Sequence, residues 1–390
     1  MTNTVIQAPS MVQQAFVEQL FLAQFYQPAE LVCHAPGRVN LMGDHTDYND
    51  GFVLPVAINY GTTIAASVRN DNLIKVYAHD CEQQSNIFSL DAITFDEEMM
   101  WSNYVRGTVQ ALMHRNPNIK GMNLVVTGNV PQGAGLSSSA SFEMAILKVF
   151  SQLYHLDLDG VNAALIGQQA ENNFVGCNCG IMDQLISAMG QQGHAMLLDC
   201  KDLSYEDAPI PDALTLFIVN SNVKRGLVDS AYNLRRQQCE QVAKYFGVSA
   251  LREVSLVQLN SAQTHIDAEL FKRARHVITE NARAIIMLAA LKENDMATIS
   301  QLMKESHASL RDDFEVTTKE MDGLVEIIDN VLGADGGVRM TGGGFGGCVV
   351  ALVPDSQIDL IKAAVNNRYE QVFNLTPSIY LCTAAQGAFR

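Results

Sequence analysis

The segment 123–150 constrains the fold of this chain most strongly, because it predicts a strand, a loop and a helix in immediate succession. The residues NLVVT at 123–127 are strand-like, and the following loop, GNVPQGAGLSSS, is rich in glycine and serine. From Phe142 onward apolar residues recur at helical spacing, which predicts a helix with one buried face. The loop therefore leads into a helix N-terminus, whose unpaired N–H groups and positive dipole end face whatever lies over it.

Phosphate is the ligand that this loop suits best. Glycines at 133 and 135 allow close approach of the backbone and positive φ angles. The hydroxyls of Ser137, Ser138 and Ser139 add hydrogen-bond donors, and one of them can turn toward a metal ion. A plain helix cap explains one serine but not three in a row, so we predict a phosphate-binding loop.

The common nucleotide-binding motifs do not account for this loop. The chain contains no G-x-x-x-x-G-K-[ST] sequence, which excludes the Walker-type NTPases. The residues GGGFGG at 342–347 satisfy G-x-G-x-x-G, but strand-like CVVALV follows them, where a dinucleotide-binding motif needs a helix. A glycine-rich turn between two strands instead predicts backbone that passes very near a ligand or the serine loop.

Charge and composition limit the possible partners and the compartment. The 42 acidic and 26 basic residues give a net charge of −16, which argues against nonspecific binding to nucleic acid or anionic membranes. Apolar runs are far shorter than the roughly 20 residues of a spanning helix, and the start of the chain lacks a secretory signal pattern, so we expect a cytoplasmic protein. The eight scattered cysteines predict reduced thiols rather than a disulfide framework or a zinc site.

The order of elements predicts an α+β fold in both halves of the chain. At 390 residues the chain is long enough for two domains. We predict strands at 53–60, 62–67, 123–127, 196–200, 214–220, 337–341, 348–353 and 378–382. We predict helices at 12–26, 101–113, 142–153, 161–174, 182–189, 229–246, 268–293, 319–332 and 357–373. A boundary near 200 divides the chain into an N-terminal domain, 1–200, and a C-terminal domain, 201–390.

Three segments of the chain resemble the motifs of the GHMP sugar and metabolite kinases. They are GRVNLMGDHTDYNDGFVLP (37–55), PQGAGLSSSAS (131–141) and GGVRMTGGGFGGC (336–348), and the first is similar to the galactokinase signature in particular. The likeness continues through ENNFVGCNCGIMDQLIS (171–187) and NSNVKR (220–225) to the C-terminal strands. The resemblance therefore covers nearly the whole chain.

The resemblance implies both a fold and a reaction. The fold is that of a GHMP kinase, with a ribosomal-S5-like N-terminal domain, a ferredoxin-like α/β C-terminal domain and the active site between them. The reaction is the ATP-dependent phosphorylation of the anomeric hydroxyl of α-D-galactose, the entry step of the Leloir route of galactose catabolism. The triphosphate of ATP is expected on Gly133, Ala134, Gly135, Leu136, Ser137, Ser138 and Ser139.

Four residues match the family's catalytic and metal-binding positions. Asp183 matches the general base that takes the proton of the acceptor hydroxyl, and Arg38 matches the arginine that stabilises the transition state. Ser139 and Glu171 match the ligands of Mg²⁺, an ion that takes hard oxygen ligands and keeps several waters. Outside these motifs, Asp183 would read as a first-turn aspartate, Arg38 as half of a surface ion pair and Glu171 as a solvent-facing residue.

The sugar is expected to contact a run of polar residues in the first motif. Asp44, His45, Thr46 and Asp47 match the family's sugar-binding run, and their carboxylates and imidazole suit sugar hydroxyls. Gly180 matches a backbone contact. Tyr232 matches a tyrosine that closes over the sugar, although a tyrosine at helical spacing also suits a core.

The chain departs from its family at position 44. The family motif reads G-E-H-T-D, whereas this chain has Gly43-Asp44-His45-Thr46-Asp47. Loss of one methylene shortens the reach of the carboxylate by about 1.5 Å. We expect this change to alter recognition at C6 of the sugar, where a bridging water can restore the contact.

Two alternatives to a galactokinase stay open at this point. One is a GHMP kinase for a related galactose derivative, such as an N-acetylated or C6-altered sugar. The other is a non-catalytic galactose sensor, against which Asp183 and Arg38 argue, because a binding protein needs no base. Trp101 and Tyr104 lie in a plausible region for the adenine pocket, but their spacing suits a core equally well. The sequence does not indicate the oligomeric state.

Overall fold

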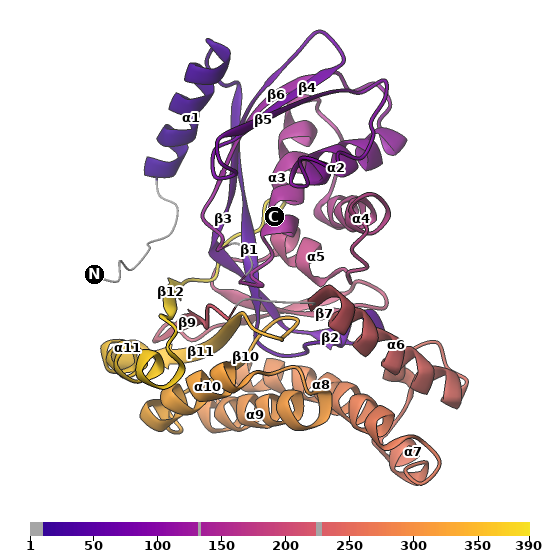
Figure 1. The fold of residues 1–390 in the computed structure, drawn as a ribbon, viewed down its shortest axis with the longest axis vertical. Coiled ribbons are helices and arrows are strands. Elements are labelled where there is room, and N and C mark those ends of the chain that lie inside the picture. Colours follow the sequence, from indigo (N-terminus) through magenta and orange to yellow (C-terminus); the bar gives the residue numbers. More distant parts are fainter. Residues whose placement is uncertain (1–10, 132–133, 224–227) are drawn as a thin grey trace.

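A five-stranded sheet forms the centre of the first half of the chain in the computed structural model, which describes residues 11–131, 134–223 and 228–390 (Figure 1). The strand order is β1-β3-β6-β4-β5, in which β4 and β6 are parallel and the other neighbours are antiparallel. The strands are β1 (Leu31–Asn40), β3 (Pro55–Val68), β4 (Leu73–Ala78), β5 (Gln84–Ser89) and β6 (Met122–Gly128).

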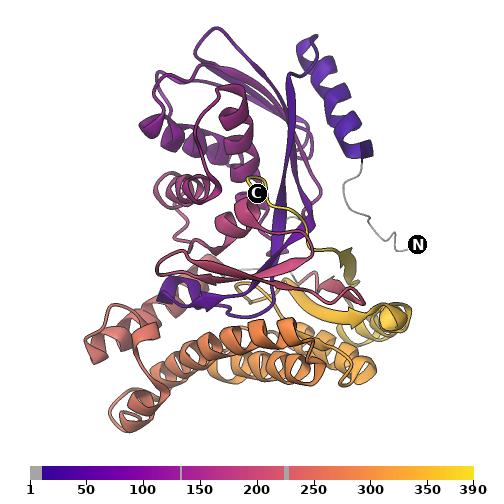
Figure 2. The same ribbon diagram turned by 180° about the vertical axis from the view of Figure 1, so that it is seen from behind.

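Helices cover both faces of this sheet (Figures 1 and 2). They are α1 (Met11–Phe25) on one face and α2 (Ser102–Arg115), α3 (Ser138–Leu153), α4 (Gly160–Ala170) and α5 (Met182–Met189) on the other. Because side chains alternate along a strand, Leu124 and Val126 of β6 pack with the α2–α5 layer, whereas Val125 packs under α1. The start of α3 lies at the edge of this layer and faces the second half of the chain.

An antiparallel four-stranded sheet, in the order β10-β11-β9-β12, organises the second half of the chain. The strands are β9 (Leu214–Asn220), β10 (Gly337–Met340), β11 (Cys348–Pro354) and β12 (Ser378–Cys382). The helices are α6 (Val228–Phe246), α7 (Leu256–Ser261), α8 (Ala268–Glu293), α9 (Met296–Ser309), α10 (Lys319–Leu332) and α11 (Ile358–Phe373). Both faces of this sheet are covered, which explains the continuous apolar run of β11.

The two halves of the chain share a hydrophobic core. Val350 and Leu352 of β11 pack with Val56 and Ile58 of β3 in one cluster, whereas Val349 and its alternate neighbours face α10 and α11. A third sheet, β2 (Phe52–Val53), β7 (His194–Asp199) and β8 (Tyr205–Pro209), adds to this contact. The end of the chain also returns to the first half, where Ala385 N donates to Ala57 O at 2.8 Å. The two parts thus meet over a broad surface, and the division at residue 200 stays a prediction.

Most elements expected from periodicity are confirmed, with two informative differences. The strands expected at 53–60 and 62–67 form the short β2 and one continuous 14-residue strand, β3. The helix expected at 161–174 is α-helical only to Ala170 and ends in a π-helical turn, η2 (Glu171–Val175). Such turns occur often at functional sites, and this one contains a predicted magnesium ligand, Glu171.

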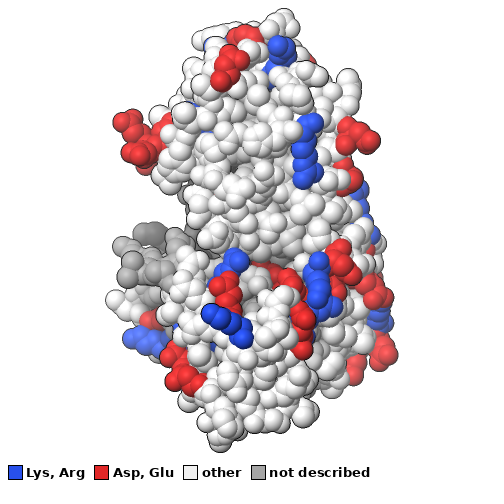
Figure 3. Space-filling view, turned by 90° about the vertical axis from the view of Figure 1, so that its right-hand side faces the viewer, with Lys and Arg blue, Asp and Glu red and all other residues white. Residues whose placement is uncertain are grey.

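One face of the molecule carries charged side chains of both signs (Figure 3). On the face shown in Figure 3, basic and acidic side chains are interspersed, and no broad basic patch lies on that face. Among the helices of the described residues, none has both the length and the apolar character required to cross a membrane.

Candidate active site

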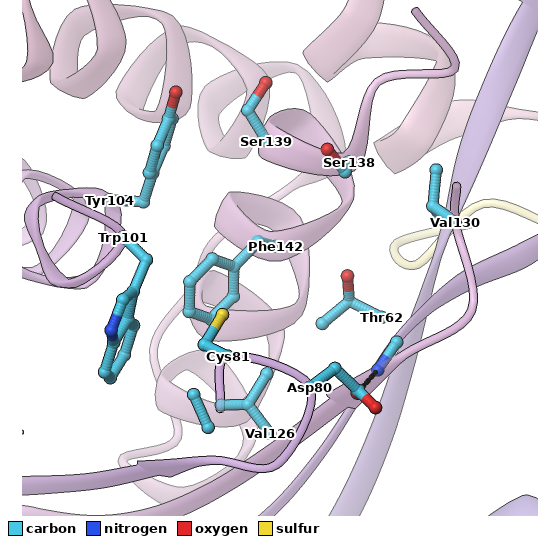
Figure 4. Close-up of a pocket in the computed structure, with 12 residues that line it drawn as sticks. Thr62, Asp80, Cys81, Trp101, Tyr104, Val126, Val130, Ser138, Ser139 and Phe142 are labelled. Carbon is cyan, nitrogen blue, oxygen red and sulfur yellow. Dashed lines mark hydrogen bonds between the residues drawn. The ribbon is translucent and has the colours of Figure 1, made fainter. Parts of the chain in front are cut away.

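A first cavity, of about 310 Å³, lies beside the start of α3 (Figure 4). Ser138 and Ser139 line it from the first turn of α3, and the rings of Trp101 and Tyr104 line it from the segment that starts α2. Phe142 contributes a further ring one turn into α3. Aromatic walls next to hydroxyls at a helix N-terminus suit a planar base followed by phosphate groups.

Hydrogen bonds fix the walls of this first cavity. Trp101 Nε1 donates to Gln84 Oε1 at 2.7 Å, which holds the indole ring in place. Asp80 Oδ2 accepts from Thr127 Oγ1 at 2.8 Å and from the Gly128 N–H at 2.7 Å. These bonds hold Trp101 and Asp80 in place around the cavity. Trp101 and Tyr104 both lie in its wall.

A second cavity, of about 250 Å³, lies between the first sequence motif, the turn before α5, and α6. Five of the predicted sugar-binding residues line it, namely Asp44, His45, Asp47, Gly180 and Tyr232. The predicted base, arginine and magnesium ligand also line it, namely Asp183, Arg38 and Glu171. Segments that are distant in the sequence are thus brought together around one polar space.

Arg38 and Asp183 form a forked ion pair in the wall of the second cavity. Arg38 Nε donates to Asp183 Oδ1 and Nη2 donates to Oδ2, both at 2.7 Å. Burial lowers the pKa of Arg38, but the charge and hydrogen bonds of Asp183, with the charges of Asp44 and Asp47, outweigh burial and leave the pKa raised, so the guanidinium keeps its charge. Asp183 lies in the first turn of α5, where the helix dipole favours a carboxylate. The pair therefore holds the Asp183 carboxyl group and a fixed cation side by side.

The serine loop contacts this ion pair directly. Arg38 Nη1 donates to Gly135 O at 2.6 Å, and the Ser137 hydroxyl donates to Asp183 Oδ2. Ser137 has a positive φ of 59°, which turns its side chain from the helix toward Asp183. Ala134 and Leu136 are buried, and Gly133 lies outside the described residues. The loop thus joins the two cavities, with Ser138 and Ser139 in the first and Ser137 against the second.

Acidic groups gather around Gln184, beside the wall of the second cavity. Gln184 Nε2 donates to Glu171 Oε2 at 2.6 Å and to Glu143 Oε2 at 3.1 Å. Burial and then the charge of Asp183 raise the pKa of Glu171 to about 7, while hydrogen bonds, including one with Ser139, oppose the rise. Burial and then Glu171 raise the pKa of Glu143 well above its usual value. The site therefore has an excess of buried carboxyl groups.

This acidic region fits a divalent cation. The Ser139 hydroxyl and the Glu171 carboxylate supply the hard oxygen donors that Mg²⁺ prefers, and a cation would offset the surplus of carboxyl groups. Among the described residues, no three or more His, Cys, Asp or Glu side chains surround one point as metal ligands do. An ion held by two protein ligands would take its remaining ligands from water and phosphate.

Buried rings and a carboxylate close the far end of the second cavity. The His45 ring lies 4.7 Å from the Phe314 ring and 5.4 Å from the Tyr232 ring, measured between centroids. Burial, and then His276, lower the pKa of His45 to about 3, so the imidazole is neutral at pH 7. Burial, and then the charge of Asp183, raise the pKa of Asp47 to about 6. Gly180 packs so closely on Asp47 that a Cβ there would overlap Oδ2.

Asp44 and Thr46 have protein partners in the structure. Asp44 Oδ1 accepts from Asn40 Nδ2 at 2.9 Å and from the Gly342 N–H at 3.2 Å, while Oδ2 pairs with Arg339. The short carboxylate therefore binds protein groups at the edge of the second cavity. Thr46 is fully buried, and its hydroxyl lies 2.7 Å from Gly43 O and from Phe52 O. A sugar contact by either residue stays a prediction.

Several lining residues were not predicted from the sequence. Cys179, Met182, Gly342 and Gly343 line the second cavity, and Asp80 lines the first. The sequence signal that could have located Gly342 and Gly343 was the glycine-rich turn itself. In the structure, a Cβ on Gly342 would lie 3.4 Å from Gly135 O. This confirms the expectation that the GGGFGG turn passes close to the serine loop. Asp80 gave no comparable signal, because it lies outside the recognised motifs.

Three family models match this chain in order. The galactokinase galactose-binding signature matches residues 19–68, the GHMP kinases N-terminal domain matches 103–191, and the GHMP kinases C-terminal model matches 287–371. The crystal structure of Lactococcus lactis galactokinase complexed with galactose is 36% identical, with a TM-score of 0.90, and the match covers 96% of this chain and 99% of that one. The chain belongs to the galactokinase family of the GHMP kinases.

More distant solved structures match this galactokinase family member in fold. Methanococcus jannaschii mevalonate kinase is 17% identical with a TM-score of 0.65, and the match covers 91% of this chain and 98% of that one. Cytophaga hutchinsonii homoserine kinase is 15% identical with a TM-score of 0.61, with coverage of 92% and 96%. The predicted GHMP kinase fold is thereby confirmed, and the chain is an ATP-dependent sugar kinase.

Proposed function

We propose that this chain transfers the γ-phosphoryl group of ATP to the anomeric hydroxyl of α-D-galactose, giving galactose 1-phosphate and ADP. The observation that carries the proposal is the forked Arg38–Asp183 pair, which lies in the wall of the sugar-sized cavity and contacts the serine loop through Gly135 and Ser137. One side of this pair faces the polar second cavity, and the loop leads to the first. A phosphoryl donor and a hydroxyl acceptor can therefore meet at this point.

Asp183 is proposed as the general base. As the anomeric oxygen attacks the γ-phosphorus, its proton passes to the Asp183 carboxylate, and the bond from the γ-phosphorus to the leaving oxygen of ADP breaks. Arg38 orients the carboxylate through two hydrogen bonds, and its cation lies where negative charge builds up during the transfer. The Ser137 hydroxyl fixes the second oxygen of the same carboxylate.

The two cavities divide the substrates between them in this proposal. Trp101, Tyr104 and Phe142 hold the adenine in the first cavity, and the segment from Gly133 to Ser139 holds the phosphates. The galactose hydroxyls are held in the second cavity by His45, Asp47, the Gly180 backbone and Tyr232, with Asp44 at the edge and Thr46 buried in the segment behind them. Ser139 and Glu171 would hold Mg²⁺, which when bound offsets phosphate charge.

The proposed compartment is the cytoplasm. None of the eight cysteines, all of which lie in the described residues, forms a disulfide bond, and those at 33, 239, 348 and 382 are buried. Free thiols that pack as small apolar groups suit a reducing compartment.

A panel of sugars tests the proposed substrate. We expect ADP release, measured with a coupled assay, to be fastest with galactose when kcat/KM is compared with N-acetylgalactosamine and 6-deoxygalactose. A higher kcat/KM for one of the derivatives would identify the chain as a kinase for that sugar. Binding of galactose and ATP without any ADP release would identify a sensor and overturn the proposal.

The magnesium assignment predicts a change in metal dependence. Ser139→Ala and Glu171→Gln are each expected to raise the Mg²⁺ concentration needed for half-maximal rate several-fold, because each removes one of few protein oxygen ligands. The rate is measured as a function of Mg²⁺ at saturating ATP and galactose. Ser151→Ala, at the far end of the same helix, serves as the matched control. Parental metal dependence in both variants would mean that the ion is held elsewhere.

A further inference from the structure

A set of buried charges from the second half of the chain holds the backbone just before His45 and Asp47. Arg339 of β10 is fully buried; its Nη1 donates to Leu41 O at 2.8 Å, and its Nη2 pairs with the Asp44 carboxylate. Leu41 and Asp44 are almost 300 residues from Arg339 in the sequence. One guanidinium thus fixes both a carbonyl and a side chain of the segment 41–44.

Glu280 of α8 holds the same segment from another direction. It is fully buried, and its Oε1 accepts from the Gly43 N–H at 3.0 Å and from Ser306 Oγ at 2.6 Å. Its Oε2 accepts from Arg283 Nε at 2.7 Å. Oε1 also lies 3.6 Å from Arg339 Nη1, so the two anchors of the segment contact each other.

The network is balanced in charge and closed by a neutral histidine. Asp44 and Glu280 oppose Arg283 and Arg339, which gives two groups of each sign. Burial lowers the pKa of His276 to about 4, so the ring is neutral and its Nε2–H donates to Asp44 O at 3.1 Å. Four groups of the segment 41–44 therefore meet partners from α8 and β10: Leu41 O, the Gly43 N–H, the Asp44 carboxylate and Asp44 O.

We infer that Arg339 and Glu280 are positioning residues that set the galactose affinity of this enzyme by fixing the segment 41–44, from which His45 and Asp47 enter the second cavity. Buried charge networks add little to stability compared with apolar packing of similar shape. We therefore assign this network the role of holding the segment 41–44 in position. Among the described residues that line the first cavity, none belongs to this network. The inference rests on the proposed function and predicts an effect on galactose that ATP does not share.

The test compares the KM for galactose with the KM for ATP in the full-length enzyme. In Arg339→Met the galactose KM is expected to rise by roughly 10–100-fold, with the ATP KM within about twofold of the parent, because a small misplacement of binding groups is costly. Arg339→Lys keeps the charge and can donate to one of the two acceptors. Its galactose KM should therefore lie between the values of Arg339→Met and the parent. Thermal unfolding of each variant shows that the measured protein is folded.

A milder pair of variants decides the matter if Arg339→Met does not fold. Ser306→Ala removes one donor to Glu280, whereas Ser300→Ala removes a buried hydroxyl of the same helix that faces Gly333 O at 3.5 Å. We expect a severalfold rise in galactose KM for Ser306→Ala and none for Ser300→Ala. A parental galactose KM in folded Arg339→Lys and Ser306→Ala, or an equal rise of both KM values, would overturn the inference. Absence of galactose turnover in the parent would instead overturn the proposed function.

Discussion

Replacing Asp183 by Asn is expected to lower kcat by roughly 10²–10⁴-fold, the range that loss of a general base typically costs. The amide keeps the shape of the carboxylate but cannot take the proton of the anomeric hydroxyl. It also loses the charge that Arg38 and Ser137 hold in place. Because the first cavity is lined by other residues, ATP should still bind, which calorimetric titration measures.

Asp199→Asn is the matched control for this prediction. Asp199 also forms a forked pair with an arginine, since Arg252 donates to both of its oxygens, but it lines neither cavity. If the loss of kcat reflects the base rather than the breaking of a buried ion pair, Asp199→Asn should keep near-parental turnover. Near-parental turnover in Asp183→Asn itself would remove the base from the proposed mechanism.

Local sequence pattern predicted much of the fold, because most elements have one buried face. Helical spacing after Phe142 located α3, and the apolar run CVVALV located β11. The prediction divided β3 into two strands because Gly61 interrupts an otherwise apolar run. In the structure Gly61 pairs with Pro36 beside a register shift, and a Cβ there would lie 2.1 Å from Ala35 O, so the glycine marks a close approach within one continuous strand.

The candidate site was less predictable, because its geometry depends on contacts between distant segments. The motifs identified Asp183, Arg38 and the serine loop, but not that Ser137 turns toward Asp183. Position 44 shows the same limit. The sequence revealed a shorter carboxylate, whereas its partner Arg339 lies in another motif and becomes visible only when β10 packs behind the loop. Trp101 and Tyr104 have a spacing that suits core residues, and only the structure shows that they line the cavity beside α3.

Arg38→Lys is expected to be nearly as damaging as loss of the base, lowering kcat by roughly 10²–10³-fold, the typical cost of removing a preorganised donor to a developing charge. Arg38 uses three separate nitrogens on one rigid plane, with Nε and Nη2 on Asp183 and Nη1 on Gly135 O. A lysine keeps the positive charge but presents a single nitrogen on a flexible chain, so it cannot orient the carboxylate and hold the loop at once.

The comparison with Arg38→Met separates charge from geometry. If charge alone matters, Lys should retain most of the parental kcat while Met loses it. If the forked geometry of the guanidinium matters, both variants should have a low kcat, and the kcat of Arg38→Lys should be little higher than that of Arg38→Met. Arg252→Lys is the matched control, because it alters a forked pair with Asp199 outside both cavities and should leave kcat unchanged. A parental kcat in Arg38→Lys would mean that orientation of Asp183 comes from Ser137 and from the start of α5, with Arg38 acting only as a point charge.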